Sequence, residues 1–315
     1  MCTAISWCGV HHFFGRNLDL ERCYGEQIAV TPRRYPLTLR SGQTLPRHHA
    51  MIGMAHMADG FPLYYEATNE CGLSAAGLNF PKSAVYHPYC EGKTNVASFE
   101  FIPWLLGSCA TLAQARTALE NLNILSESFC AALPASPLHW IVADKTGTLT
   151  VESTADGLHV YENDVCVLTN EPPFPLQRTN LRRYTALTPQ PVQGDPGRGA
   201  GTAELPGGLD SVSRFVRAAF TAATARPGED EYQGVSRFFH LLNAVAQPDG
   251  CVILPDGSCQ HTIYSSCCDT DSGIYYYTTS HNAALTAVDM HREDPEGDTV
   301  AAYPMNTVQQ VLWQN

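Results

Sequence analysis

The chain has 315 residues, with 19 Lys and Arg against 31 Asp and Glu, and therefore a formal net charge of -12. This acidity argues against a nucleic-acid partner, because phosphate binding needs basic surfaces. The uncharged stretches 101–115 and 128–143 are too short to cross a bilayer and contain Pro. With 44% apolar residues the composition is that of an ordinary globular protein, and we expect neither a nucleic-acid nor a membrane partner.

The first half of the chain is predicted to mix strands with a helical region. Apolar runs predict strands at 27–31, 50–57, 72–79, 138–143, 148–152, 158–161 and 165–169. A hairpin turn is expected at 144–147, and a further turn at 163–164. Helical spacing appears over 98–109 and continues in a second helix, where Thr111 suits an N-cap and Gln114 its capping-box partner.

The second half alternates less regularly. Pro and Gly fill half of the segment 189–208, which predicts a long surface loop rather than an interdomain linker, because neither flank resembles an independent domain. Amphipathic helices are predicted at 211–225 and 235–246, followed by strands at 262–267, 273–280 and 284–289. Without strict βαβ alternation, this order predicts antiparallel sheets covered by helices in layers, within a single domain over 1–315.

The chain contains 12 cysteines, and no two of them have C-x-x-C spacing, so neither a zinc ribbon nor a thioredoxin-like site is supported. Its beginning lacks the basic segment and apolar run of a secretory signal. We therefore expect a reduced, cytoplasmic protein whose cysteines mostly serve packing. The histidine pairs at 11–12 and 48–49 show neither helical spacing nor neighbouring carboxylates, and no metal site or cofactor is expected.

Cys2 follows the initiator Met directly, and a small residue there permits removal of the Met. Cys2 would then carry both a thiol and a free α-amine, groups whose ordinary pKa values are about 8.5 and about 7.7–8.0. The amine could accept the proton of the thiol, so that one residue supplies nucleophile and base. Taken alone, Cys2 is more simply a residue near a frayed end.

Arg16 and Asp19 lie a short distance further on. A buried arginine near a thiol favours the thiolate, and an aspartate can accept hydrogen bonds from an α-amine. Alone, the two residues would more simply form a surface ion pair. Together with Cys2 they predict a nucleophile, an activator and an orienting group.

Short motifs in a fixed order carry a resemblance that covers essentially the whole chain. They are MCT at 1–3, GRNLD at 15–19, GLNFP at 77–81, LHW at 138–140, VLTN at 167–170, SRF at 213–215 and GIYYY at 273–277. In these segments the sequence resembles the choloylglycine hydrolases, which include bile salt hydrolases and penicillin V acylases, within the N-terminal nucleophile hydrolases.

The resemblance implies an α+β fold, a four-layer αββα sandwich of two antiparallel sheets between helix layers, and a homo-oligomer, a tetramer or a dimer. It implies cleavage of an amide between an acyl group and an amino acid through a thioester. By motif, Cys2 is the nucleophile, Arg16 supports the thiolate and Asp19 positions the amine. Asn170 supplies a side-chain oxyanion donor, Asn79 a backbone N–H, and Arg214 stabilises the charge of the site.

The asparagine at position 79 favours conjugated bile salts as substrates, because penicillin V acylases commonly have tyrosine there. Leu18, Phe129 and Leu133 are expected to line the apolar acyl pocket, although Phe129 and Leu133 could equally be core residues. The segments 128–136 and 207–212 depart from the family pattern, so glycine and taurine conjugates both stay open. A penicillin V or other N-acyl amide hydrolase and a bile-acid binder without activity remain alternatives, and acyl transfer to other amino acids is expected as an additional reaction of the thioester.

Overall fold

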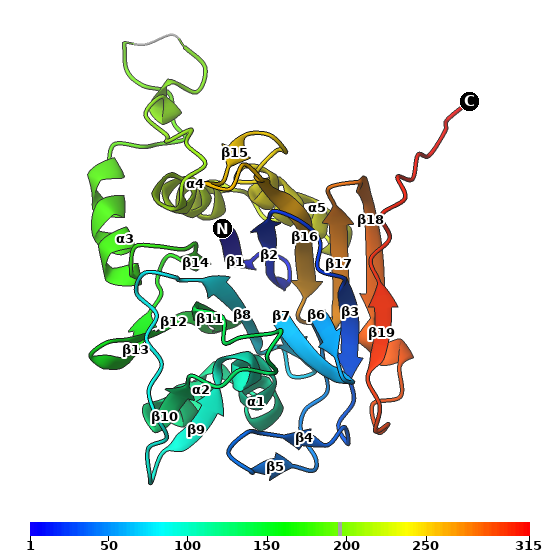
Figure 1. Ribbon diagram of the computed structural model, residues 1–315. Helices are drawn as coiled ribbons and strands as arrows, with labels where there is room; N and C mark the ends of the chain where they lie inside the picture. The colour runs from blue at the N-terminus through cyan, green and yellow to red at the C-terminus, as the bar shows by residue number, and fades with distance from the viewer. Residues whose placement is uncertain (195–196) are drawn as a thin grey trace.

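Two antiparallel β-sheets form the centre of the fold (Figure 1). The computed structural model describes residues 1–194 and 197–315. In spatial order, the first sheet contains β14 (Val167–Leu168), β1 (Cys2–Cys8), β2 (His12–Leu20), β16 (Cys259–Asp269), β17 (Ile274–Thr279) and β18 (Asn282–Asp289), with β15 (Val252–Ile253) paired to β16. The second sheet contains β13 (Gly157–Glu162), β12 (Gly147–Thr154), β11 (Leu138–Asp144), β8 (Ser74–Asn79), β7 (Phe61–Asn69), β6 (Met51–Ala58), β3 (Glu26–Thr31) and β19 (Ala301–Pro304).

Helices cover the outer face of each sheet. Helices α4 (Ser211–Thr224) and α5 (Glu231–Asn243) pack on the first sheet, whereas α1 (Phe101–Ser108) and α2 (Leu112–Glu120) pack on the second. One apolar core fills the space between the sheets and under α4 and α5, and another lies between the second sheet and α1 and α2. The four-layer αββα sandwich is therefore confirmed.

The remaining elements are short. Two small sheets pair β9 (Thr94–Ala97) with β10 (Leu122–Leu125) and β4 (Leu37–Thr38) with β5 (Thr44–Leu45). The other helical segments are α3 (Phe174–Leu181) and the 3₁₀ turns η1 (Ser98–Glu100), η2 (Arg182–Tyr184), η3 (Ala200–Thr202) and η4 (Met290–Arg292).

Most elements expected from the sequence are present, and the hairpin is formed by β11 and β12. Thr111 caps α2 by accepting the N–H of Gln114 at 3.3 Å. The Gln114 side chain does not complete the capping box, because it accepts from the N–H of Ala110 at 2.7 Å instead. The turn at 163–164 does not join neighbouring strands, since β13 lies in the second sheet and β14 in the first.

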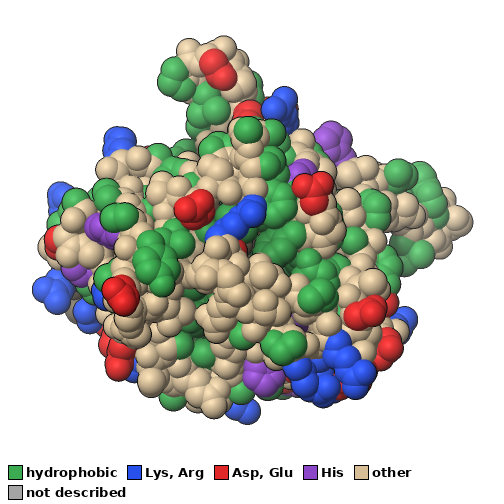
Figure 2. All heavy atoms as spheres, turned by 60° about the horizontal axis from the view of Figure 1, so that its bottom comes forward, with side chains coloured by type: hydrophobic (Ala, Val, Ile, Leu, Met, Phe, Trp, Pro, Cys, Tyr) green, Lys and Arg blue, Asp and Glu red, His purple; other side chains and the backbone are tan. Residues whose placement is uncertain are grey.

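The segment 189–208 contains η3 and otherwise loop, and residues 195–196 lie outside the described residues. Its described parts project from the body at the top of Figure 1. On the face shown in Figure 2, one group of basic side chains lies at the lower right and others lie along the left edge, while acidic side chains are spread among apolar and uncharged ones. None of the helices in the described ranges has the length and apolarity to cross a membrane.

Candidate active site

Adjacent strands β1 and β2 bring together the first residues of the candidate site. Cys2 pairs with Leu18, and Ala4 pairs with Arg16. Because side chains alternate along a strand, Cys2, Arg16 and Leu18 share the face that looks toward the second sheet. Cys2, which is only 3% exposed, lies in the core between the sheets. The residues expected to be nucleophile and activator therefore lie on neighbouring strands and on the same face of the sheet.

Arg16 crosses to the second sheet, where β7 and β8 diverge. The pairing of these strands ends at Glu66 and Ala76. The next carbonyls, those of Tyr65 and Gly77, accept hydrogen bonds from Arg16 Nη1 at 3.0 and 2.6 Å. Burial opposes the charge of Arg16, but Cys2, Tyr264 and Glu66 outweigh it and hold the pKa of the guanidinium above its usual value. Within the described part of the chain, Nε and Nη2 have no hydrogen-bond partner.

Glu66 is the main residue of this site that the sequence did not reveal. Its carboxylate accepts hydrogen bonds from the hydroxyls of Tyr264, Tyr275 and Ser266 at 2.7, 2.5 and 2.9 Å. It lies 3.7 Å from Arg16 Nη1, and both side chains are buried. Burial raises the pKa of Glu66, and Arg16 and the three hydroxyls act against that increase. Glu66 therefore supplies the buried counter-charge of Arg16.

Asp19 lies on the opposite face of β2, toward the helices that cover the first sheet. Its Oδ1 accepts the hydroxyl of Thr262 at 2.7 Å, and its Oδ2 lies 3.9 Å from Arg214 Nη1. Burial raises the pKa of Asp19, whereas Arg214 and Thr262 lower it. The first sheet thus presents Arg16 on one side and Asp19 on the other, with the end of β1 between them.

Arg214 enters the site from α4, near the Asp210 N-cap of that helix. Its Nη1 donates to the carbonyl oxygen of Cys2 and to Thr3 Oγ1, both at 2.6 Å, and its Nη2 donates to Asn170 Oδ1 at 2.8 Å. Burial lowers the pKa of Arg214, and Asp19 opposes that decrease. The expected charge near Cys2 is present, and it also holds the backbone of β1 in place.

Asn170 follows β14 and connects the two sheets. Its Oδ1 accepts the backbone N–H of Cys2 at 2.8 Å, and its Nδ2 donates to the carbonyl oxygen of Asn79 at 2.8 Å. The Asn79 side chain itself is exposed. All six residues expected to be catalytic therefore converge, with Asn170 in contact with both Cys2 and Asn79.

The first residue continues the pairing of β1 with β2. The amine of Met1 donates to the carbonyl of Asp19 at 2.8 Å, and the N–H of Asp19 donates to the carbonyl of Met1 at 3.0 Å. Burial lowers the pKa of this amine below its usual value. An amine at this end of the strand therefore loses its proton more readily than one in water.

An apolar cavity of about 250 Å³ begins beside the carbonyls that Arg16 binds. Its wall includes Tyr65, Gly77, Phe129 and Leu133. Leu18 does not line it, and instead lies between Cys2 and Tyr264 in the sheet. Two of the three residues expected in the acyl pocket thus face this cavity, and the third packs against the candidate nucleophile.

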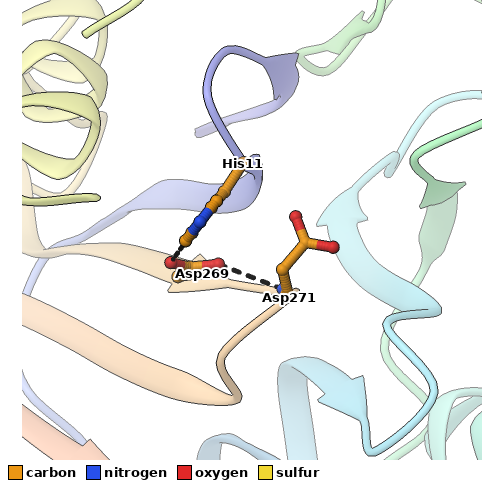
Figure 3. A group of neighbouring side chains, drawn as sticks. All are labelled: His11, Asp269 and Asp271. Atoms are coloured by element: carbon orange, nitrogen blue, oxygen red, sulfur yellow. Dashed lines mark hydrogen bonds and ion pairs between the residues drawn. The ribbon is translucent and has the colours of Figure 1, made fainter. Parts of the chain in front are cut away.

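A separate group of potential metal ligands lies at the turn after β16 (Figure 3). Ligand atoms of His11, Asp269 and Asp271 lie within 4.8 Å of one another. Asp269 Oδ2 is 2.6 Å from His11 Nδ1, and Asp269 Oδ1 accepts the N–H of Asp271 at 3.0 Å. The Asp271 carboxylate accepts the N–H of His12 at 2.9 Å. These hydrogen bonds are those of an ordinary turn. The expectation that His11 has no neighbouring carboxylates was wrong, because Asp269 and Asp271 come from a distant part of the chain.

Comparisons with known proteins agree with this geometry. The αββα sandwich holds a buried cysteine, two buried arginines and a bridging asparagine. Residues 2–303 match the linear amide C–N hydrolases of the choloylglycine hydrolase family. The chain belongs to the choloylglycine hydrolase family.

Its relatives include a bile salt hydrolase/transferase from Lactiplantibacillus plantarum, 43% identical over 98% of both chains. Another, from Clostridium perfringens, is 34% identical over 97% of both chains. Solved structures of two variants of the conjugated bile acid hydrolase from Clostridium perfringens superpose with a TM-score of 0.92, at 32% identity and full coverage of both chains. A penicillin V acylase from Agrobacterium tumefaciens shares the fold, with a TM-score of 0.79 at 20% identity over 96% of this chain and 90% of its own.

Proposed function

We propose that this protein hydrolyses the amide bond of glycine- or taurine-conjugated bile salts, with Cys2 as the nucleophile. The observation that carries the proposal is the buried contact of Cys2 with Asn170 and Arg214, one strand away from Arg16. The wall of an apolar cavity includes Tyr65 and Gly77, whose carbonyls accept the hydrogen bonds of Arg16. The names of the relatives, which are bile salt or conjugated bile acid hydrolases, support the choice of substrate.

The reaction requires removal of Met1, because Cys2 otherwise carries a peptide nitrogen that cannot act as a base. The freed amine accepts the proton of the thiol, and the thiolate attacks the carbonyl carbon of the amide. Asn170 Nδ2 and the Asn79 N–H bind the resulting oxyanion. The carbon–nitrogen bond then breaks, the amino acid leaves with the proton from the amine, and water hydrolyses the thioester.

Arg16 and Asp19 act on the two groups of Cys2 from opposite sides. The free Nε and Nη2 atoms of Arg16 favour a thiolate. Asp19 Oδ2, which has no hydrogen-bond partner among the described residues, is available to an amine at this end of β1. The burial that lowers the pKa of the Met1 amine would act on a Cys2 amine in the same direction and favour its neutral, basic form.

The test is turnover of glycocholate and taurocholate together with the intact mass. Active protein should lack Met1 and release free bile acid. Cys2→Ala should lose this activity completely while unfolding as the parent does. Cys109→Ala, which removes another buried thiol, serves as the control and should stay active.

The same measurements separate the alternatives. Faster release of phenoxyacetate from penicillin V than of bile acid would favour a penicillin V acylase. Binding without turnover, in protein that begins at Cys2, would favour a bile-acid binder. The hydrolase/transferase names of relatives support acyl transfer to amino acids other than the original one, which excess amino acid in the assay would reveal as new conjugates.

We also propose that the protein works in the cytoplasm as a homo-oligomer. All the cysteines are free thiols, which suits a reducing compartment. The tail after β19 exposes Val308, Val311, Leu312 and Trp313, and apolar groups of this kind suit a subunit contact. Light scattering during size-exclusion chromatography should give the mass of a dimer or tetramer, and a monomer would contradict the proposal.

A further inference from the structure

Two buried polar atoms lie on the wall of the apolar cavity next to Arg16. They are Trp140 Nε1 and Ser98 Oγ. Their side chains belong to residues that are 0% and 3% exposed. Trp140 Nε1 has no hydrogen-bond partner among residues 1–194 and 197–315, whereas the Ser98 hydroxyl interacts with that of Tyr86. A buried polar group without a partner costs about 1–3 kcal/mol, so the unpartnered indole N–H on the cavity wall requires an explanation.

Trp140 is one of the residues that line the cavity. It lies on β11 opposite Gly77, and its ring stacks on Phe101 with centroids 4.4 Å apart. A Cβ atom at Gly77 would lie 3.3 Å from Trp140 Nε1. The glycine therefore leaves open the space beside the indole N–H. The carbonyl oxygen of Gly77 also accepts a hydrogen bond from Arg16. The indole nitrogen therefore lies beside a residue that contacts the candidate active site.

Ser98 approaches the cavity from η1, beside Tyr86. The Tyr86 hydroxyl donates to the carbonyl of Ser136 at 2.6 Å and accepts the N–H of Leu138 at 2.7 Å. Burial raises the pKa of Tyr86 to about 12, and the Ser98 hydroxyl counteracts part of that increase. Since the proton of Tyr86 goes to Ser136, Ser98 can direct its own proton toward Tyr86 and keep its lone pairs for a group in the cavity.

We propose that Trp140 Nε1 and Ser98 Oγ form a subsite for a hydroxyl oxygen on the acyl part of the substrate. The indole N–H is a donor only, and the serine oxygen can accept, so together they match a hydroxyl, which both accepts and donates. The proposal rests on the proposed function, since it assumes an acyl group in this cavity. Another unpartnered atom, His56 Nδ1, belongs to a partly exposed side chain on β6 and is not included.

The prediction is that oxygenation of the steroid selects substrates through this pair. Wild-type protein is compared on glycine conjugates of cholic, deoxycholic, chenodeoxycholic and unsubstituted cholanic acids. At least one hydroxylated conjugate should exceed the cholanic conjugate in kcat/KM by about 3- to 10-fold, the range expected for one hydrogen bond. Trp140→Phe and Ser98→Ala should reduce that ratio toward 1, whatever their effect on turnover of the cholanic conjugate itself.

Trp104→Phe is the matched control, because Trp104 is a buried tryptophan of α1 that does not line the cavity. It should preserve the ratio between substrates. If Trp140→Phe does not fold, Ser98→Ala alone carries the test. A ratio unchanged in the folded variants, or an equal loss on every substrate, would overturn the subsite.

Binding of the free bile acids distinguishes this failure from failure of the proposed function. Calorimetry on Cys2→Ala measures the affinity ratio between hydroxylated and cholanic acids, with and without Ser98→Ala. A ratio that falls when Ser98 is changed supports the subsite even if the wild-type protein turns over no bile salt. Turnover with a ratio that does not depend on Ser98 or Trp140, or absence of any binding, refutes the subsite.

Discussion

Arg214 and Asn170 are joined by a hydrogen bond of 2.8 Å from Nη2 to Oδ1. The same oxygen accepts the N–H of Cys2 at 2.8 Å. With two donors on Oδ1, the amide has one favoured orientation, and its Nδ2 is directed toward Asn79. The position of the expected oxyanion donor is thus fixed by an arginine that comes from a different layer of the fold.

Substitution of Asn170 should lower the rate of the chemical step. Asn170→Ala removes the side-chain donor, and the loss of one oxyanion donor typically costs about 10²–10³ in kcat. Asn170→Asp keeps an acceptor for Cys2 and Arg214 but lacks the Nδ2 donor, and should also be strongly impaired. Asn180→Ala, on nearby α3, should retain activity. Steady-state kinetics on glycocholate check this, and a change confined to KM would contradict the assignment.

Arg214→Gln should destabilise the protein as well as inactivate it. The change removes hydrogen bonds to Cys2, Thr3 and Asn170 and leaves Asp19 as a buried charge without its cation, which typically costs about 3–5 kcal/mol. Adding Asp19→Asn should restore part of the free energy of unfolding but no activity. Urea unfolding of both single variants and the double variant measures this coupling. Strict additivity would show that the two charges do not interact.

His12 should make stability depend on pH. It is buried between Ser6 and Thr270, and burial lowers its pKa to about 4, against the pull of nearby carboxylates. The unfolded chain, with a histidine pKa near 6.5, binds the proton first as the pH falls. The contribution of neutral His12 to the free energy of unfolding is therefore fully present above about pH 6.5. It decreases by about 3 kcal/mol as the pH falls to 4.

Urea unfolding at several values from pH 4 to pH 7 measures this dependence. His12→Asn should unfold with a flatter pH profile than the parent, whereas the exposed His281 can be changed to Asn without altering the slope. An unchanged slope in His12→Asn would show that other groups dominate the acid sensitivity.

Gly15 should tolerate no side chain. A Cβ atom there would lie 1.9 Å from the carbonyl oxygen of Ser266 on β16, so β2 and β16 would have to separate. We expect Gly15→Ala to lower the free energy of unfolding by more than about 3 kcal/mol or to prevent folding. Gly207→Ala, where a Cβ meets no atom within 4 Å, is the control. Near-parental stability of Gly15→Ala would refute this close approach.

The sequence predicted the layered class of fold and six converging residues, because the relevant motifs are short and local. It missed β1 and β2 as strands. In β2 nearly every residue is buried, including the polar side chains of His12, Arg16, Asn17 and Asp19. A strand buried on both faces with polar residues shows no apolar–polar alternation, and only the partners supplied by the fold make that burial favourable.

The partners of these polar residues lie too far along the chain for a sequence pattern to reveal. Tyr264 and Tyr275 are separated from Glu66 by 198 and 209 positions, and His11 is separated from Asp269 by 258. The pairing of β2 with β16 brings the C-terminal residues beside the N-terminal ones. The counter-charge of Arg16 therefore becomes visible only once the order of strands is known.

Because β7 and β8 diverge, an arginine at position 16 has a structural role in addition to its expected catalytic one. Its guanidinium donates to two carbonyl oxygens, to which backbone N–H groups would donate if β7 and β8 stayed paired. Arg16 thus replaces a backbone hydrogen bond of the second sheet. A related protein without catalytic activity would still need this arginine to hold β7 and β8 together where their backbone pairing ends. Retention of Arg16 in a relative is thus weak evidence for activity. An Arg16 variant without activity could have lost either the stabilisation of the thiolate or the hydrogen bonds that join β7 and β8.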